Sequence, residues 1–168
     1  ALSPWNGYAG ALTFHQGRLW LGGNKLRPQS VWASKVDDYT NFEVGTDADD
    51  GMDLTILSQK RDRICWMMAA DGILVGTESS EWAISGEQGR AITPTSFDIK
   101  RQSGEGSSSI PPVMAPQSLV YVKQGNTQLM ELSYSFQDDG WISQDLTLLA
   151  EQMCKPGVKQ MVIQRLPY

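Results

Sequence analysis

Histidine and the usual catalytic motifs are scarce in this chain of 168 residues. His15 is the only histidine, so a histidine-based nucleophilic mechanism would have to use it. The sequence has no Gly-x-Ser-x-Gly motif and no Gly-x-x-x-x-Gly-Lys phosphate loop. We therefore interpret His15 as a hydrogen-bonded imidazole just before a strand, assign no catalytic residue and expect no cofactor.

Cysteines and long apolar runs are equally few. Cys65 and Cys154 are 89 residues apart (154 − 65). Two cysteines are too few for a disulfide scaffold, and they lack the paired spacing of a zinc site. We interpret both as free thiols. The longest apolar stretch, 64–75, is interrupted by Asp71 and Gly72 and is far shorter than the roughly 20 residues that span a bilayer, so no membrane contact is expected.

Positive charge is in deficit, with 14 Lys and Arg against 19 Asp and Glu and a net charge of −5. Because non-specific DNA affinity comes mainly from Lys and Arg, the absence of a basic stripe argues against a nucleic-acid-binding protein. Charged residues are only 20% of the chain, whereas 16 Gly and 8 Pro favour short strands and many turns. The predicted fold class is all-β.

The sequence repeats itself with a period of about 46 residues. Asp53-Leu-Thr-Ile-Leu-Ser is echoed by Asp145-Leu-Thr-Leu-Leu-Ala, 92 residues later (145 − 53), and Asp98 lies near the midpoint. Such a period is typical of a β-propeller blade, a small antiparallel meander. We predict propeller-like units at about 12–52, 53–97 and 98–144 with a partial unit at 145–168, and Asp53, Asp98 and Asp145 opening equivalent strands. This is about 3.7 units, close to the lower limit of roughly four blades for a ring, so either the ring is incomplete or the first and last segments share a blade.

Each unit contains a short apolar run and, after a polar turn, a second strand. The runs are 17–22, 71–76 and 117–122, and their partners are 30–34, 80–84 and 128–132. The segment 64–68 is apolar on both faces, as in the middle of a packed sheet. The segment 103–109 is interpreted as an exposed linker, and 146–153 as at most a short helix. Tryptophans in these strands are expected to pack in the core, namely Trp20, Trp32, Trp66 and Trp82.

Several strings carry a family resemblance over most of the chain. They are Phe14–Gly23 (FHQGRLWLGG), Pro28–Lys35 (PQSVWASK), Asp38–Phe42, Glu78–Gly86 (ESSEWAISG), Ile92–Thr95, Lys100–Gln102 and Asp145–Leu149. Together they resemble the tail nozzle, or tail tubular protein B, family of short-tailed bacteriophages and their prophage relatives.

The resemblance implies a virion structural protein made in the bacterial host cytoplasm. Such a protein is a propeller-containing subunit of a hexameric tail tube that passes DNA during ejection, without catalysis. Its partners would be other copies of itself and other tail proteins such as a tail adaptor. Members of the family are several times longer. With no initiator Met and an end at Leu166-Pro167-Tyr168, we expect a piece of a longer polypeptide or an unusually short relative.

An acidic segment around Gly51 is the clearest candidate site. Asp47, Asp49, Asp50 and Asp53 resemble a calcium loop, but Gly51 is the fifth position where an EF-hand needs the sixth, and the twelfth is Ser58. We predict a solvated acidic turn, with a cation held in another geometry as the alternative. Within the tail hypothesis this loop is the candidate channel surface, because carboxylates repel phosphates and let a duplex pass without tight binding.

Two other hypotheses stay open. The second hypothesis is a sialidase-type carbohydrate-binding or glycan-hydrolysing propeller. Segments 34–42 and 135–141 resemble degenerate Asp-boxes, the turn motif of sialidase-type blades, but this motif is structural: it supports propeller architecture and says nothing about hydrolysis. Hydrolysis would need two carboxylates roughly 5–9 Å apart. The third hypothesis is a propeller interaction scaffold. Trp5 and Trp141 are candidates for subunit contacts, and an incomplete ring would expose edges and apolar faces that favour self-association.

Overall fold

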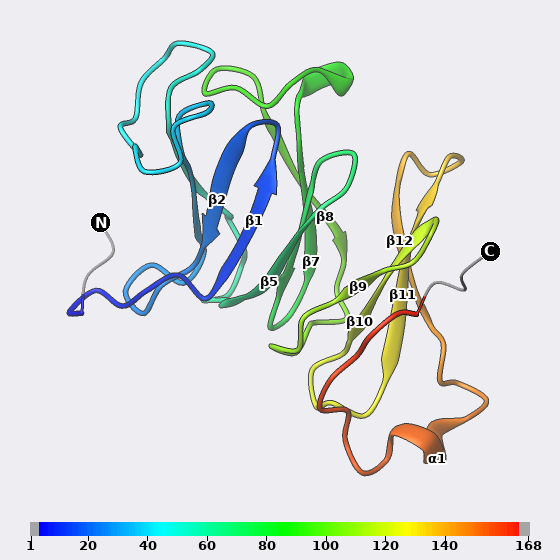
Figure 1. Cartoon of the computed structure of the whole chain (residues 1–168). Coiled ribbons are helices and arrows are strands. Elements are labelled where there is room, and N and C mark those ends of the chain that lie inside the picture. The colour runs from blue at the N-terminus through cyan, green and yellow to red at the C-terminus, as the bar shows by residue number, and fades with distance from the viewer. Residues whose placement is uncertain (1–3, 165–168) are drawn as a thin grey trace.

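The computed structural model describes residues 4–164, which form three four-stranded antiparallel sheets (Figure 1). Sheet 1 consists of β1 (Ala11–His15), β2 (Arg18–Gly22), β3 (Ser30–Ala33) and β4 (Met52–Thr55). Sheet 2 consists of β5 (Ile64–Ala69), β6 (Ile73–Thr77), β7 (Glu81–Ser85) and β8 (Asp98–Ser103). Sheet 3 consists of β9 (Val113–Met114), β10 (Ser118–Val122), β11 (Leu129–Ser135) and β12 (Gly140–Asp145). The all-β prediction is confirmed.

Helical structure is limited to two short pieces among the described residues. A 3₁₀ turn, η1 (Glu87–Gly89), lies between β7 and β8, and a single turn, α1 (Glu151–Cys154), follows β12. The second agrees with the short helix expected within 146–153. Every strand pairs with the next strand of its own sheet, so the chain is a succession of meanders in which strand direction alternates.

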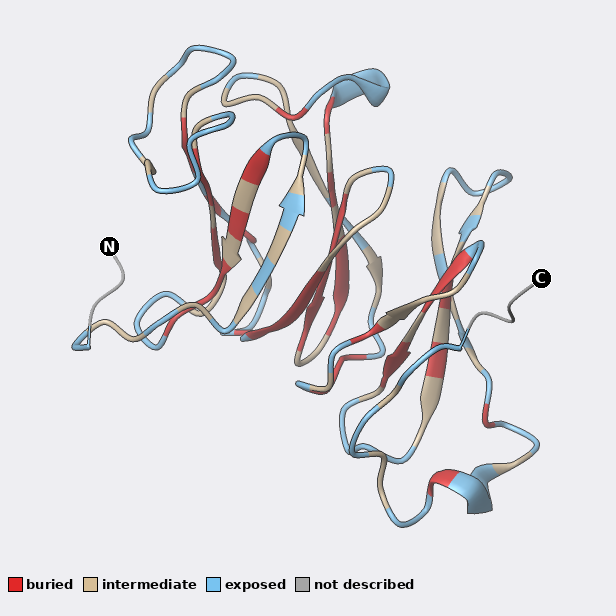
Figure 2. Ribbon diagram, in the orientation of Figure 1, coloured by how far each residue is buried: buried red, intermediate tan, exposed pale blue. Residues whose placement is uncertain are grey.

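Sheet 2 lies between the other two and is buried on both faces (Figure 2). Alternation along its strands divides its side chains between two cores, because successive strand residues point to opposite faces. In β6, Ile73 and Val75 pack against sheet 1, whereas Leu74 packs against sheet 3. All five residues of β6 are buried.

The two cores are built from alternate residues of the facing strands. Sheet 1 contributes Trp20, Val31, Ala33, Met52 and Leu54 to the first core, and sheet 3 contributes Leu119, Tyr121, Met130 and Leu132 to the second. Of the four strand tryptophans, Trp20, Trp66 and Trp82 are buried as predicted. Trp32 is half-buried and belongs to neither core, so that prediction is wrong.

The apolar segment 64–68 forms β5, but its place in the sheet differs from the prediction. β5 is the first strand of sheet 2 and pairs through hydrogen bonds with β6 alone. It is buried on both faces because sheet 2 is covered on both sides, with a register shift between Ile64 and Trp66. Cys65 and Trp66 both join the second core as a result.

The six predicted runs all appear as strands and occupy equivalent positions. They form β2, β6 and β10, the second strand of each sheet, and β3, β7 and β11, the third. Leu21, Val75 and Tyr121 lie opposite Trp32, Trp82 and Met130, respectively.

The predicted repeat boundaries differ from those of the sheets. Asp53, Asp98 and Asp145 all lie on the fourth strand of a sheet, but only Asp98 opens its strand, since Asp53 is second in β4 and Asp145 ends β12. β4 and β8 therefore complete the preceding sheet instead of starting a new unit. Residues 146–164 add no strand, and residues 4–164 form no closed ring.

The Ser- and Gly-rich segment 103–109 connects sheets 2 and 3, as expected of a linker, but it is not an exposed one. Gly106, Ser107 and Ser108 are buried. The reason is Glu81, a fully buried carboxylate in β7 that accepts hydrogen bonds from the hydroxyls of Ser103 and Ser107. The two serines thus fasten the connection to sheet 2, and burial raises the pKa of Glu81.

A raised pKa at Glu81 predicts a specific pH dependence of stability. A group that binds its proton more tightly in the folded state contributes stability that is complete below its unfolded value and is lost as pH rises through the folded one. We therefore expect the free energy of unfolding of Glu81→Gln, relative to that of the natural protein, to increase as pH rises above the ordinary glutamate value of 4.5. Chemical denaturation at several pH values measures this difference. Glu87→Gln removes the same charge from an exposed turn and is the control. A difference between Glu81→Gln and the natural protein that is constant with pH would contradict the prediction.

Candidate functional site

The acidic segment lies in the long connection between β3 and β4, at one end of sheet 1. Asp47 and Asp49 are exposed and form no ion pair within the described residues. Asp50 is half-buried, pairs with Lys35 at 3.0 Å and accepts the amide of Asp47 at 3.1 Å. The hydrogen bond from Lys35 is the main cause that lowers the pKa of Asp50.

Asp53 does not belong to this loop, contrary to the expected grouping. It lies in β4, where the guanidinium of Arg27 donates two hydrogen bonds of 2.7 Å to its carboxylate. The four aspartates are therefore divided between an exposed loop tip, an ion pair with Lys35 and an ion pair on the sheet. Across residues 4–164, no three His, Cys, Asp or Glu side chains converge to hold a metal ion.

A buried arginine holds the acidic loop in place. Arg18 in β2 is 1% exposed, and its guanidinium donates to the main-chain carbonyls of Ser34 (2.7 Å) and Ala48 (2.6 Å) and also to that of Asp50. Burial lowers the pKa of Arg18, while nearby Asp49 and Asp50 favour its charged form. The charge is thus satisfied by carbonyl dipoles, and the loop backbone is fixed while Asp47 and Asp49 stay at the surface.

The two predicted Asp-box turns occupy the same place in their sheets. Segment 34–42 follows β3 and segment 135–141 connects β11 to β12, so each leaves a third strand. Asp38 accepts the Thr40 hydroxyl at 3.0 Å, and Asp138 accepts the Ser135 hydroxyl at 2.7 Å. Both carboxylates stabilise local turns, which agrees with the structural role expected of this motif.

The two tryptophans proposed for subunit contacts have different environments. Trp5 is 89% exposed at the start of the described chain. Trp141 is half-buried, packs against the second core and meets Tyr134 edge to face at 5.8 Å between ring centroids. Trp141 also lines a cleft of about 440 Å³ between sheets 2 and 3, together with Tyr134, Asp71, Asp98, Lys100 and Asp139.

His15 ends β1, and its environment differs from the expected satisfied imidazole. Its Nε2 atom is buried without a hydrogen-bond partner. Burial lowers the pKa of His15, so the ring is neutral over most of the physiological range.

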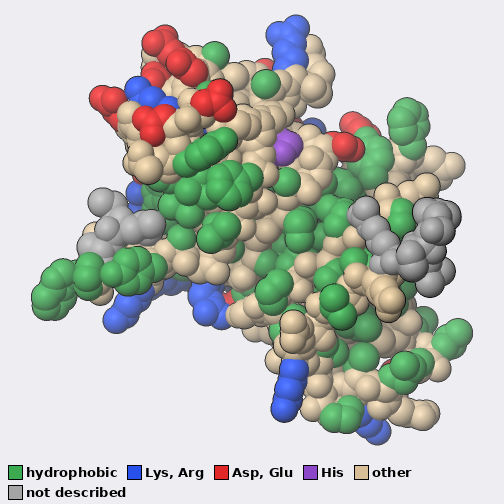
Figure 3. All heavy atoms as spheres, viewed as in Figure 1, with side chains coloured by type: hydrophobic (Ala, Val, Ile, Leu, Met, Phe, Trp, Pro, Cys, Tyr) green, Lys and Arg blue, Asp and Glu red, His purple; other side chains and the backbone are tan. Residues whose placement is uncertain are grey.

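The outer face of sheet 1 carries an apolar surface that the sequence did not reveal. Leu12, Leu21 and Trp32 lie opposite one another in successive strands, so they form one row across the sheet. Phe14 and Leu19 form a second row, and Phe14 meets Tyr39 edge to face at 5.3 Å. Leu12 and Phe14 are 62% and 58% exposed. Figure 3 shows hydrophobic side chains gathered over β1 and β2.

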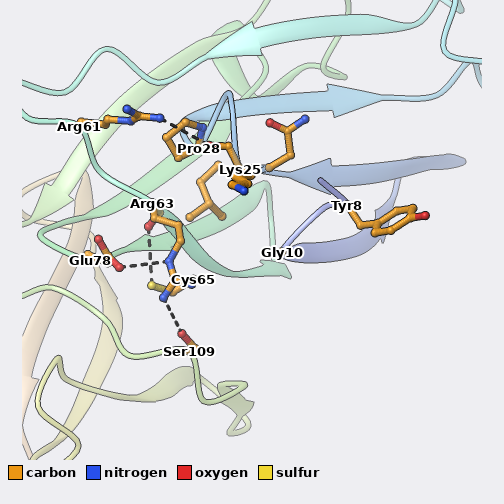
Figure 4. A pocket seen from close by; sticks show the side chains of 12 residues that line it. Tyr8, Gly10, Lys25, Pro28, Arg61, Arg63, Cys65, Glu78 and Ser109 are labelled. Carbon is orange, nitrogen blue, oxygen red and sulfur yellow. Dashed lines mark hydrogen bonds and ion pairs between the residues drawn. The ribbon is translucent and has the colours of Figure 1, made fainter. Parts of the chain in front are cut away.

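A basic groove lies at the opposite end of sheet 1 from the acidic loop. It has a volume of about 620 Å³ and runs between the β2–β3 turn, the β4–β5 connection and the β6–β7 turn. Lys25, Arg61 and Arg63 line it from the first two of these connections, and Figure 4 shows Arg61 directed toward Lys25 and Arg63 directed toward Glu78 and Ser109. Glu78 is the one carboxylate among its described lining residues.

Only one cation of the groove is neutralised. Arg63 donates to Glu78 at 3.1 Å and to the hydroxyl of Ser109 at 3.1 Å. Lys25 and Arg61 form no ion pair with any described residue, and Arg61 donates only to the main-chain carbonyl of Lys25, at 3.5 Å. The residues that line the groove come from connections far apart in the sequence, so no local motif predicted it.

The cysteines agree with their prediction. Cys65 and Cys154 are both free and buried. Burial raises the pKa of Cys65, which also lines the groove, to about 11, so its thiol is neutral at physiological pH.

Comparison with known proteins does not assign the chain to a family. Neither the models of protein families nor the curated proteins give a match. Within residues 4–164, no helix has the length and apolar character needed to span a bilayer.

Arg18 provides a test of how the acidic loop is held. Replacing it with Met keeps much of the side-chain volume but leaves the carbonyls of Ser34 and Ala48 without their charged donor. We expect a loss of about 3 kcal/mol in the free energy of unfolding, since a hydrogen bond to a charged group contributes about 1.5–3 kcal/mol. Limited proteolysis should also cut within 36–50 earlier than in the natural protein.

Arg27→Met is the matched control for this prediction. Arg27 has an exposed guanidinium that pairs with Asp53, and such surface pairs contribute about 0–1 kcal/mol. Equal losses in the two variants, with unchanged proteolysis of 36–50, would show that Arg18 does not hold the loop.

Proposed function

We propose that this protein is a structural, non-catalytic subunit of a short-tailed phage or prophage tail that assembles laterally with copies of itself around the DNA channel. The observation that carries this proposal is the apolar outer face of sheet 1. Sheets 1, 2 and 3 already stack in series through apolar faces. The rows formed by Leu12, Leu21 and Trp32 and by Phe14 and Leu19 have the character of a further face of the same kind.

The occupant that continues this series is sheet 3 of a second copy. Its outer face carries Val120 and Ile142 beside Glu131 and Ser133, whereas Tyr121 and Trp141 point inward. A contact between sheet 1 of one copy and sheet 3 of the next joins two different surfaces, so it is heterologous and produces a ring when the rotation closes. The family resemblance supplies the expectation of six copies and of a tail adaptor as a further partner. Propeller-like architecture belongs to this proposal, since three sheets alone leave the ring open.

Passage of DNA without tight binding is the second part of the proposal. Asp47 and Asp49 stay exposed at the tip of a loop that Arg18 fixes, so they are available to a channel surface that repels phosphates. Virion location and synthesis in the host cytoplasm follow from the same proposal.

A carbohydrate-binding protein is the second candidate, and the cleft between sheets 2 and 3 favours it. Tyr134 and Trp141 offer aromatic surface next to Asp71 and Asp139, a combination that suits sugar hydroxyls. The cleft suits neutral sugars better than sialosides, because Lys100, the one cation of its described lining, already pairs with Asp98 at 2.9 Å. Glycan-array binding that Tyr134→Ala abolishes would select this candidate over the tail protein.

Lateral association is tested by charging the outer face of sheet 1. At high salt, we expect the natural protein to show mass that increases with concentration in analytical ultracentrifugation, and Leu12→Lys/Phe14→Lys to remain monomeric, because burying two lysines without partners is costly. Leu57→Lys/Phe136→Lys changes the same residue types at 86% and 92% exposed sites outside the face, and is expected to associate like the natural protein. A natural protein that stays monomeric at high concentration would contradict the proposal.

A further inference from the structure

Charges are separated between the two ends of the sheet array. Because strand direction alternates, each connection within and between sheets emerges at one of two ends. The connections at the end of the β3–β4 loop, 34–51, 70–72, 86–97 and 136–139, contain 10 Asp and Glu and 2 Lys and Arg. Those at the other end, 23–29, 56–63, 78–80, 104–112 and 123–128, contain 3 Asp and Glu and 6 Lys and Arg. Figure 3 shows the red cluster over the β3–β4 loop and blue side chains along the opposite edge of sheet 1.

The basic end is concave and its charge is uncompensated. The groove described above contains Lys25 and Arg61 without carboxylate partners, beside an Arg63 that Glu78 already neutralises. Both free cations are exposed. Such a groove attracts an anionic group and can accommodate a loop rather than a flat surface.

The acidic end is convex and preorganised. Residues 46–49 are all exposed, and the loop projects beyond the strands of sheet 1 (Figure 1). Arg18 and Lys35 fix its backbone and Asp50, so Asp47 and Asp49 are presented without further ordering of the chain. A loop that is already ordered loses less conformational entropy when it binds.

We infer that copies of this chain also join end to end, with the β3–β4 loop of one copy seated in the basic groove of the next. Asp47 and Asp49 would pair with Lys25 and Arg61 of the second copy, leaving Arg63 with Glu78. The loop and the groove lie at opposite ends of the same sheet, so the contact is heterologous and can propagate along the strand direction. This inference rests on the proposed function in taking a second copy as the partner, but it uses a different surface from the lateral contact.

Charge complementarity favours a second copy over nucleic acid as the occupant. The two free cations of the groove match the two free carboxylates of the loop, whereas a duplex carries one charge per about 1.7 Å and needs a longer row of cations than this groove supplies. The contact should weaken with salt, because exposed charges are screened within about 8 Å at physiological ionic strength.

Reciprocal charge variants test this contact in the full chain. The groove variant is Lys25→Gln/Arg61→Gln, and the loop variant is Asp47→Asn/Asp49→Asn. Analytical ultracentrifugation is expected to show salt-sensitive association for the natural protein and none of it for either variant alone. An equimolar mixture of the two variants has one intact loop and one intact groove. We expect it to restore one contact per pair and to form a two-copy species with no larger salt-sensitive assembly.

Three outcomes would overturn the inference. The first is salt-sensitive association of both variants at the level of the natural protein, and the second is a mixture without the two-copy species. The third is micromolar binding of a labelled DNA duplex, measured by anisotropy and lost in the groove variant, which would make the groove a polyanion site. Lys155→Gln/Lys159→Gln makes the same charge change outside the groove and should behave like the natural protein.

The same measurements separate this inference from the lateral proposal. Salt-sensitive association that persists in Leu12→Lys/Phe14→Lys would support the end-to-end contact even where the lateral contact fails. Salt-resistant association that persists in the groove variant would support the lateral contact even where the end-to-end contact fails.

Discussion

Burial of sheet 2 on both faces is the constraint on which the rest of the structure depends. Sheets 1 and 3 each have one apolar inner face, and within the described residues sheet 2 is the partner of both. Strict alternation in β6 and β7 makes this possible, since Val75 and Trp82 serve one core while Leu74 and Ala83 serve the other. Each outer sheet therefore has a second face that does not pack against sheet 2.

Stacking in series also determines where charge can lie. The cores occupy the middle of each strand, so charged residues concentrate in the connections at the two ends of the array. Two of the buried charged groups begin a strand and fasten a connection: Arg18, the first residue of β2, holds the acidic loop, and Glu81, the first residue of β7, holds the link to sheet 3. The acidic loop and the basic groove are therefore positioned by the same strands that build the cores.

The sequence predicted the positions of the strands better than it predicted which side chains pack against one another. Apolar runs bounded by turn residues located β2, β3, β6, β7, β10 and β11, because this signal is local. Trp32 and Trp82 occupy equivalent third strands in their sheets, yet only Trp82 packs in a core between two sheets. The burial of Ser107 depends on Glu81, 26 residues earlier, and the groove joins Lys25, Arg61 and Glu78 from three connections. Such features depend on long-range packing, which composition and spacing do not encode. The sequence located the acidic loop, but it did not show that Asp53 lies outside this loop, on β4, and pairs with Arg27.

Native-state amide hydrogen exchange tests the central role of sheet 2 most directly, because it measures the opening free energy of each strand. The account predicts that amides of β6 and β7 exchange most slowly, with the opening free energy of global unfolding. Amides of sheet 1 and sheet 3 should exchange faster and as two separate groups, since either outer sheet can open while sheet 2 keeps its other core. Amides of β6 and β7 that exchange no more slowly than those of β2 and β3 would contradict the account, because sheet 1 would then be stable without its partner.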